Sequence, residues 1–474
     1  MKRVILSLLL LFVFLVGYAQ NRKDVVCRLG FSYEISQNNF WGKSKPVVTL
    51  VYPYTSAEQA GVLQYDIIDE IDGVDTGLLS PEEISQLLYS AKKSDVMLTI
   101  RNLKDSARHL LIKKEYKKIN AITEDQLAAA FSMYSLETTN EQEFTCPFKV
   151  TVSPEPVELS LFKTFAFSAV DENNRRLETA INDAVEKELT KKGLTVNAKQ
   201  PDLLIQTFYF FDKNPNYIGQ NKVVVSSEAV RRYNFTRSKF EEFPFLSVGA
   251  AEAEAEYLLQ FGFRLIDQRV IPGRVLWECE ASELLSDSYR LEDYVRIHVP
   301  LMCLQYPYAK NTQNMTFRVI KRGYNYTGID YDIDRLEQVA DVAPNSPAQA
   351  SGIRPRDIIE RIGNHELGYS AEEFTEAYKQ FVYNTIGYRD PHTLFKDVNG
   401  FKYCMLWDLS KYAQVADAIQ NPAYLPAFSY LYNFVPYVNP ADNNTCIFNV
   451  RRGETKLEFV IRPTIRSEVM IEVQ

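Results

Sequence analysis

The sequence has few of the residues from which catalytic and metal sites are usually built. Its 474 residues include 4 His and 6 Cys, with no CxxC pair and no Cys/His zinc spacing. It contains no HExxH helix, glycine-flanked serine nucleophile, phosphate-binding loop or dinucleotide fingerprint. His109 and His298 each lie in a run that alternates like a strand, which favours structural roles. We therefore expect a non-enzymatic protein with no metal and no cofactor. We expect the cysteines to be buried thiols, and one or two disulfide bonds among them remain possible.

Positive charge and long apolar runs are also scarce. The net charge is −8 and the pI is about 5.4, which argues against a nucleic-acid partner. The apolar run Val4–Val16 follows two basic residues and is shorter than the roughly 20 residues that span a bilayer. Small residues after it fit cleavage after Ala19. We predict a signal peptide over residues 1–20, no transmembrane anchor in the mature chain, and export to the periplasm, the cell surface or the medium.

One segment of the chain occurs twice. Val51–Ile71 and Val342–Ile362 align without a gap roughly 290 residues apart, whereas solenoid repeats recur every 20–50 residues or so. In each, a Pro-containing turn leads to a short Ala-rich helix, a glycine stops it, and an Asp opens an Ile-Ile strand. The matched positions are Val51/Val342, Pro53/Pro344, Ala57/Ala348, Gly61/Gly352, Asp66/Asp357, Ile67/Ile358, Ile68/Ile359 and Ile71/Ile362. The pattern indicates a duplicated module.

Both segments resemble the most recognisable stretch of the PDZ domain. The resemblance implies two small β-barrel or sandwich modules, each with a groove helix, that bind a peptide by strand addition. The first would cover residues 27–116. Its carboxylate-binding loop would be residues 28–31, because a glycine lets successive backbone amides face one anion. The peptide-binding residues implied there are Arg28, Leu29, Gly30, Phe31 and Tyr33.

A helix predicted over Pro81–Ala91, with Ser80 as its N-cap, would form the other wall of this groove. Ser85 and Leu88 would face the ligand. Pro81 stands where some PDZ domains carry a His that selects Ser or Thr in the ligand, so that preference is not expected here.

The second module would cover residues 315–474. Its loop would be Thr327, Gly328 and Ile329, and its groove helix Glu372–Gln380 would present Thr375 and Tyr378. The closing strands come late, after an aromatic-rich insertion over about residues 384–444. Long unbroken loops tend to be functional. A lid, a partner surface, a dimer contact and a packed subdomain all remain open for it.

The region between the modules has a different character. Residues 117–143 are predicted to be a linker with a capping box at Thr123 and Gln126 and a short helix over Gln126–Tyr134. Residues 144–305 read as strands around a helix, Arg176–Lys192, which ends at Gly193. The order of Thr164, Gly193, Pro201-Asp202 and Trp277 in this region resembles the exported DUF4136 family. That resemblance implies an α+β fold with an antiparallel or mixed sheet, and brings no catalytic residue.

Two acidic motifs have simple structural explanations. Asp75-Thr76-Gly77 spells the aspartic-protease triplet, but it stands between a strand and the groove helix of a PDZ-like module. Asp330, Asp332 and Asp334 alternate, but the positions for the calcium-loop Gly and Glu hold Arg335 and Asp341. We expect neither a protease nor a calcium site.

Together these features predict an α+β multidomain protein that binds a protein or peptide partner through PDZ-like grooves in the cell envelope, either at a C-terminus or along an extended segment. A peptidase or peptidase accessory with a site in the middle domain is the second interpretation. A purely structural assembly with closed grooves is the third. The oligomeric state is left open.

Overall fold

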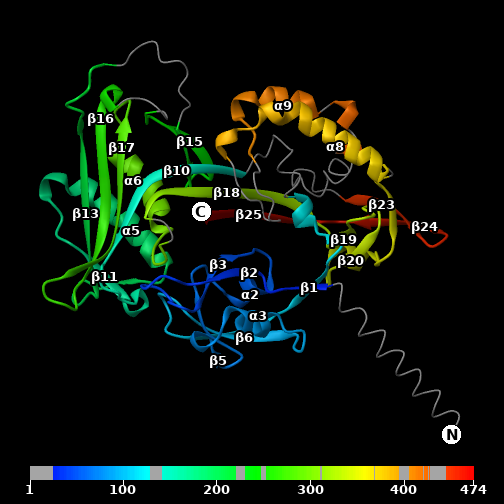
Figure 1. Ribbon diagram of the computed structural model, residues 1–474, viewed down its shortest axis with the longest axis horizontal. Coiled ribbons are helices and arrows are strands. Elements are labelled where there is room, and N and C mark those ends of the chain that lie inside the picture. The colour runs from blue at the N-terminus through cyan, green and yellow to red at the C-terminus, as the bar shows by residue number, and fades with distance from the viewer. Residues whose placement is uncertain are drawn as a thin grey trace, which may run out of the picture. The chain divides into compact units, whose positions relative to one another are not determined.

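The computed structural model describes residues 25–128, 141–219, 230–246, 252–309, 312–363, 365–367, 369–393, 405–419, 421–424, 426–427 and 445–474 (Figure 1). The chain forms two compact units. The first unit comprises Leu29–Glu115, Glu143–Arg318 and Glu472–Gln474. The second unit comprises Met1–Arg28, Tyr116–Gln142 and Val319–Ile471. The expected signal peptide and linker residues 129–140 lie outside the described residues.

The N-terminal repeat, residues 29–115, is an antiparallel sheet with two helices, α2 and α3. Its main strands are hydrogen-bonded in the order β2-β3-β4-β6-β7, so β2 is an edge strand. Its elements are β2 (Phe31–Ile35), β3 (Pro46–Val51), α2 (Ser56–Ala60), β4 (Ile67–Ile71), β5 (Val74–Asp75), α3 (Pro81–Tyr89), β6 (Asp95–Arg101) and β7 (Arg108–Lys113).

Local sequence signals fix the two helices of this repeat. Ser80 and Glu83 form a capping box at the start of α3, with Pro81 at its first position. Gly61 ends α2 with φ 86°, a conformation that costs glycine little. Ile84 and Leu88 turn from α3 into the core.

The rest of the first unit is built on a mixed sheet, in the order β12-β11-β13-β16-β17-β10, and β18 and β25 belong in part to each unit. β11 is parallel to β12 and β13, and the β13-β16-β17-β10 pairings are antiparallel. Helices α5 (Arg175–Lys191) and α6 (Leu291–Cys303) pack against each other beside it (Figure 1). The strands are β10 (Glu141–Val152), β11 (Thr164–Phe167), β12 (Thr195–Val196), β13 (Leu203–Lys213), β16 (Tyr257–Asp267), β17 (Arg274–Leu285), β18 (Gln313–Tyr326) and β25 (Thr464–Val473).

The N-terminal repeat is fastened to this sheet within the first unit. The Tyr65 ring of the repeat lies 5.6 Å from the ring of Tyr308, which follows α6, and the Trp41 indole of the same repeat holds Tyr65 by donating to its carbonyl. Lys163 donates from its ammonium group to the carbonyls of Asn102 and Leu103. Buried aromatic packing with charge-assisted hydrogen bonds makes a firm junction.

The C-terminal repeat, residues 327–461, has the same order of elements up to its helix. β19 (Ile329–Asp332), β20 (Val339–Val342), α7 (Pro347–Ser351), β21 (Ile358–Ile362), β22 (His365–Glu366) and α8 (Ala371–Thr385) come first. β23 (Cys446–Arg452) and β24 (Thr455–Ile461) follow the insertion. From the preceding segment, β1 (Val25–Arg28) pairs with β8 (Glu115–Lys118), and β9 (Ala121–Ile122) pairs with β19.

Smaller elements complete the described chain. A hairpin of β14 (Val230–Asn234) and β15 (Lys239–Phe243) lies between β13 and β16 in the chain. Helix α9 (Tyr412–Ile419) lies in the C-terminal insertion. Short 3-10 turns occupy Thr76–Leu78, Leu159–Leu161, Glu172–Asn174, Glu252–Glu254, Ile386–Tyr388, Pro391–Thr393, Leu409–Lys411 and Pro422–Tyr424.

The predicted α+β class is confirmed, and α5 falls where its apolar period placed it. The capping box at Thr123 and Gln126 is present, and residues 124–128 are helical. The strand predicted around His298 is wrong, because these residues form α6. That helix is buried on nearly all sides, so its sequence shows no polar face from which a helical period could be read.

Candidate peptide-binding edges

The loop before β2 has the backbone shape that its sequence predicts. Gly30 has φ 87°, and a Cβ added there would clash with the side chain of Thr55. Only glycine fits such a position without strain. Leu29 and Phe31 on either side are buried in the core of the repeat. The loop is therefore held by its flanking side chains, while its backbone makes the turn.

β2 forms one border of its sheet, and no strand of the described chain pairs with its outer side. We call this backbone, with the loop before it, the β2 edge. The Tyr33 side chain reaches from β2 to Ser85 on α3, and burial raises the pKa of Tyr33 while the Ser85 hydrogen bond opposes the rise. Leu88 is fully buried, so it supports the wall from behind. Arg28 is exposed at the end of β1, in the second unit.

The corresponding loop of the C-terminal repeat is built in the same way. Gly328 also has φ 87°, and a Cβ there would clash with Ser346, the N-cap of α7. Ile329 is buried as Phe31 is. Both strands that follow have a register shift at the same place, between Ser32 and Tyr33 and between Asp330 and Tyr331. We call this backbone and loop the β19 edge.

Unlike the β2 edge, the β19 edge is occupied by the chain itself. The Glu124 side chain lies in the loop, and its Oε2 accepts hydrogen bonds from the amides of Thr327 at 2.8 Å and Gly328 at 2.9 Å. The Thr327 hydroxyl donates to the other oxygen, Oε1. Glu124 is 3% exposed. Three donors around one buried carboxyl group make an anion nest of the predicted kind.

The residues before Glu124 extend along β19 as an added strand. β9 runs antiparallel to β19, with Ile122 opposite Tyr331 and Ala121 opposite Asp332. The carbonyl of Asn120 accepts from the amide of Ile333 at 2.7 Å. Ile122 packs against the core of the repeat. The segment therefore offers backbone, an apolar side chain and a carboxyl group together.

Two lysines fasten the chain just before this strand. Lys117 forms an ion pair of 2.8 Å with Asp330, which is nearly buried, and Lys118 donates to the carbonyl of Ala340. Removal from water raises the pKa of Asp330, and the Lys117 charge opposes that rise. We call residues 117–124, which make all these contacts, the linker segment.

The Glu124 carboxyl group has an unusually high pKa. Burial raises its pKa to about 7, although the hydrogen bonds from Thr327 and Gly328 favour its charged form. The group is therefore close to half-ionised at neutral pH. In either protonation state Oε2 can accept from the two amides.

The residues predicted to face a ligand on the second groove helix lie on its exposed side. Thr375 and Tyr378 are exposed on α8, while Ala377 and Phe381 face the core. In the insertion, Trp407 and Tyr424 are buried against Phe381 with ring centroids 6.0 and 5.5 Å away. These residues of the insertion thus pack into the core of the C-terminal repeat. The other aromatic residues of the insertion lie outside the described residues: Phe395, Phe401, Tyr403, Phe428, Tyr430, Tyr432, Phe434 and Tyr437. The side chain of Tyr412 also lies outside them.

Each repeat is braced by one buried aspartate and one arginine. Asp66 accepts from the Leu63 amide and from Arg108, which also donates to the Gly61 carbonyl. Asp357 accepts from the Arg354 amide and from Arg452, which also donates to the Gly352 carbonyl. Sequence reasoning found both aspartates and missed both arginines, which start β7 in one repeat and end β23 in the other.

The two acidic motifs are structural in this protein. Asp75 caps the turn after it by accepting from the Gly77 amide, and the Thr76 hydroxyl donates to the Ile68 carbonyl. Asp332 accepts from the backbone of Asp334 and Arg335. Within the described ranges, no cluster of His, Cys, Asp or Glu is arranged to hold a metal ion.

The middle region holds a buried polar cluster. Arg232 donates to both oxygens of Glu283, and the Tyr294 hydroxyl donates to the same carboxylate. His298 Nδ1 donates to the Tyr294 carbonyl, so its Nε2 accepts from Arg232 at 2.9 Å. Burial, with the Arg232 charge, keeps the pKa of His298 well below its usual range. These side chains are 0–7% exposed and bond to one another, as a structural network does.

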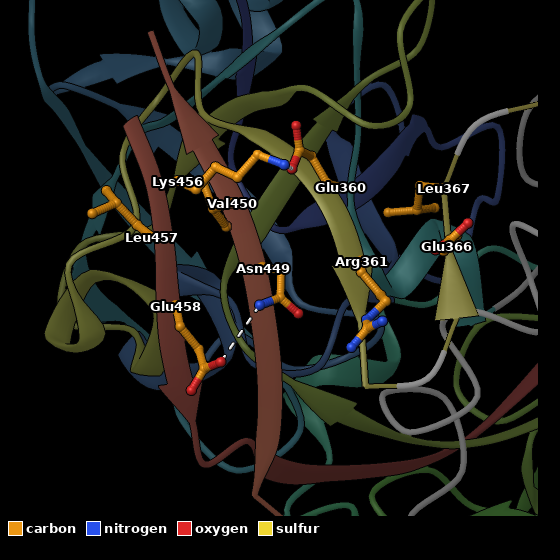
Figure 2. A pocket seen from close by; sticks show the side chains of 9 residues that line it. All are labelled: Glu360, Arg361, Glu366, Leu367, Asn449, Val450, Lys456, Leu457 and Glu458. Atoms are coloured by element: carbon orange, nitrogen blue, oxygen red, sulfur yellow. Dashed lines mark hydrogen bonds and ion pairs between the residues drawn. The ribbon is translucent and has the colours of Figure 1, made fainter. Parts of the chain in front are cut away.

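Cys146, Cys279 and Cys303 are buried thiols outside any disulfide. An open depression of about 570 Å³ lies on β21, β22, β23 and β24 of the C-terminal repeat, lined by side chains of both charges, such as Glu360, Arg361 and Glu458 (Figure 2). Among the helices that the structure describes, none has the length and apolar character needed to cross a membrane.

Comparisons with known proteins agree with this architecture. A PDZ domain family matches residues 47–102, and a domain of unknown function, DUF4136, matches residues 150–308. These two expectations are confirmed. The crystal structure of a PDZ domain protein from Parabacteroides distasonis ATCC 8503 is 64% identical, covers 95% of this chain and 100% of that one, and has a TM-score of 0.77. No curated protein matches.

Two more distant structures were also found. The HtrA3 PDZ domain bound to a phage-derived ligand is 19% identical, over 20% of this chain and 88% of that one, with a TM-score of 0.17. A PelC L103M dodecamer from Paraburkholderia phytofirmans is 10% identical, over 34% of this chain and 95% of that one, with a TM-score of 0.16. Neither likeness is strong enough to support an argument.

Proposed function

The chain belongs to the same family as the Parabacteroides distasonis PDZ domain protein, and from that premise we propose that it is a non-enzymatic binding protein of the cell envelope. Its N-terminal repeat takes a peptide C-terminus or an extended segment along the β2 edge. The observation that supports this most is that β2 borders its sheet with no strand on its outer side among the described residues. Such an edge offers backbone donors and acceptors to an incoming strand.

The loop of the β2 edge supplies the second element of the proposal. Gly30 has the same φ as Gly328, whose amide binds the Glu124 carboxyl group in the other repeat. We propose that the amides of Leu29 and Gly30 receive a ligand carboxylate in the same way. The C-terminal repeat, which shares the loop, the register shift and the aspartate–arginine brace, is proposed to be a second PDZ-like module.

The proposed location is the periplasm or the outside of the cell. It rests on the basic, apolar and small-residue pattern of residues 1–20. The buried cluster of Arg232, Glu283 and His298 gives no support to a peptidase site, because these side chains bond to one another and are hidden from solvent.

The test is a binding screen of the full mature chain against peptides with free C-termini and their amidated copies. Gly30 is a poor position for the blocking variant, because any side chain there clashes with Thr55 and disturbs the loop itself. Ser85→Trp is better, since Ser85 lies on α3 beside Tyr33. Gln86→Trp is the matched control, because the next residue of the helix is exposed.

We expect binding that needs the free carboxylate, that weakens at least tenfold in Ser85→Trp and that persists in Gln86→Trp. Equal binding of the amidated copies would disprove capture of the carboxylate. No binding by any peptide, or equal loss in both variants, would contradict the β2 edge as the site.

A further inference from the structure

We propose that the linker segment, residues 117–124, is a built-in ligand that fills the binding edge of the C-terminal repeat, with the Glu124 side chain in the place of a peptide carboxylate. The proposal rests on the assignment of that repeat as a PDZ-like module. It goes beyond that assignment in three ways, because it names the segment that fills the β19 edge, the class of peptide that would compete for this edge, and what controls access to it.

The strand direction and the chemical groups of the contact support the assignment. A ligand added to such an edge must run antiparallel and end with its carboxylate at the loop. β9 runs antiparallel to β19, and the chain reaches the loop at Glu124, two residues after Ile122. All three groups that a ligand would use are present at once: paired backbone, an apolar side chain against the core, and a buried carboxyl group.

The way in which the chain continues explains why a side chain is used. A true C-terminus would end at the loop, whereas this chain turns into a helix at residue 124. The turn is fixed by the Thr123 and Gln126 capping box, in which the Thr123 amide donates to Gln126 at 2.9 Å. The Glu124 side chain is thereby aimed at the amides of Thr327 and Gly328.

The occupant also defines what else can bind. A competing ligand would be an extended peptide with a β-branched apolar residue two positions before a carboxyl group. Because the linker segment is tethered, it acts at an effective concentration on the order of millimolar, so it lowers the apparent affinity of a competitor. The C-terminal repeat is therefore closed in the isolated chain and opens only when the linker segment is released.

The binding experiment uses a labelled, amidated peptide that copies residues 115–126, and a second copy with Gln in place of the residue that matches Glu124. Both are titrated at pH 6, below the pKa of about 7 that burial gives Glu124, into the full chain and into the variant Ile122→Ala/Glu124→Ala. All proteins also carry Ser85→Trp. Binding at the β2 edge is then removed, and failure of the function proposed above is distinguished from failure of this inference.

We expect the Glu copy to bind the double variant at least tenfold more tightly than it binds the protein with the unaltered linker segment. The double variant should also bind the Glu copy at least tenfold more tightly than it binds the Gln copy. Equal binding by both proteins would overturn the inference, because the edge would then be open already. Absence of binding to the double variant, with its circular dichroism unchanged, would overturn it too.

Hydrogen exchange of the full chain keeps the inference testable if the double variant does not fold. Glu124→Gln should speed exchange at least tenfold in residues 119–124 and 327–332. The matched control is Glu454→Gln, at an exposed turn of the same unit, which should leave these amides unchanged. Unchanged exchange in Glu124→Gln would contradict the role of its carboxyl group.

Discussion

The two repeats are alike in the parts that hold the fold and different along the edge strand that follows the glycine loop. Both have a glycine at φ 87° before the binding strand, the same register shift, and a buried aspartate held by an arginine. Yet no strand of the described chain pairs with the outer side of β2, whereas β19 carries β9 and the Glu124 carboxyl group. A duplicated scaffold can thus present one open and one filled edge.

The difference arises from a segment outside both repeats. Residues 117–124 follow the last strand of the N-terminal repeat and make their contacts with the C-terminal repeat. The chain itself thus covers the β19 edge, as the closed-groove interpretation would require of a binding module. The binding interpretation is kept for the β2 edge.

The largest expected effect tests the shared scaffold. Asp66→Ala removes the acceptor for Arg108, Asn102 and the Leu63 amide, and Asp357→Ala removes the acceptor for Arg452 and the Arg354 amide. Leaving such groups unsatisfied should lower the free energy of unfolding by about 2–4 kcal/mol in each variant. Urea unfolding measures the loss, and hydrogen exchange shows which repeat it affects.

The control is Asp334→Ala, at an exposed residue in the C-terminal repeat, which should cost little. A loss below about 1 kcal/mol in either aspartate variant would break the comparison, because the two braces would then not be equivalent.

The next effect tests the filled edge through pH. The folded-state pKa of Glu124 is about 7, against an ordinary value of 4.5, so the folded state binds this proton more tightly than the unfolded state does. Its contribution to stability is full below pH 4.5 and is lost as the pH rises through 7. The stability difference between the unaltered protein and Glu124→Gln should fall by roughly 2–3 kcal/mol between pH 5 and pH 8.

Unfolding of both proteins at the two pH values measures this change. Groups such as Asp66, whose pKa burial raises to about 6, titrate in both proteins and cancel in the difference. A difference that is constant, or that grows with pH, would show that Glu124 is not buried as its hydrogen bonds to Thr327 and Gly328 indicate.

Much of the scaffold could be predicted because its signals are local. A glycine stop, an N-cap and a Pro-containing turn each act within a few residues, and Gly61, Gly352, Ser80 and Ser346 all have the roles expected of such residues. The α5 helix has a clear apolar stripe because one of its faces meets solvent.

The occupant of the β19 edge could not be predicted in this way. Glu124 and Thr327 are 203 residues apart, and nothing in either segment records the contact. The capping box at Thr123 was visible, but it specifies only where a helix begins. The linker residues were therefore read as a connection. The α6 helix was missed for a different reason, since burial on nearly all sides removes the polar positions that mark a helical period.

The smallest expected effect concerns the open edge. Tyr33 and Tyr331 occupy matching positions, but Tyr331 lies opposite Ile122 and is fully buried, whereas Tyr33 is half-buried and reaches Ser85 on α3. Tyr33→Phe should lower the free energy of unfolding by about 0.5–1.5 kcal/mol, the usual net value of one hydrogen bond. Peptide affinity at the β2 edge should change less than threefold, because a strand-added ligand binds mainly to backbone. Thermal unfolding and peptide titration of Tyr33→Phe and of Ser85→Ala measure both quantities.

The double variant tests whether Tyr33 and Ser85 act as a pair. If the two changes remove the same hydrogen bond, the free energy of unfolding of the double variant should lie within about 0.5 kcal/mol of that of the less stable single variant. Fully additive losses would mean that Tyr33 and Ser85 do not act as a pair, and that the wall of the open edge is held by the buried Leu88 alone.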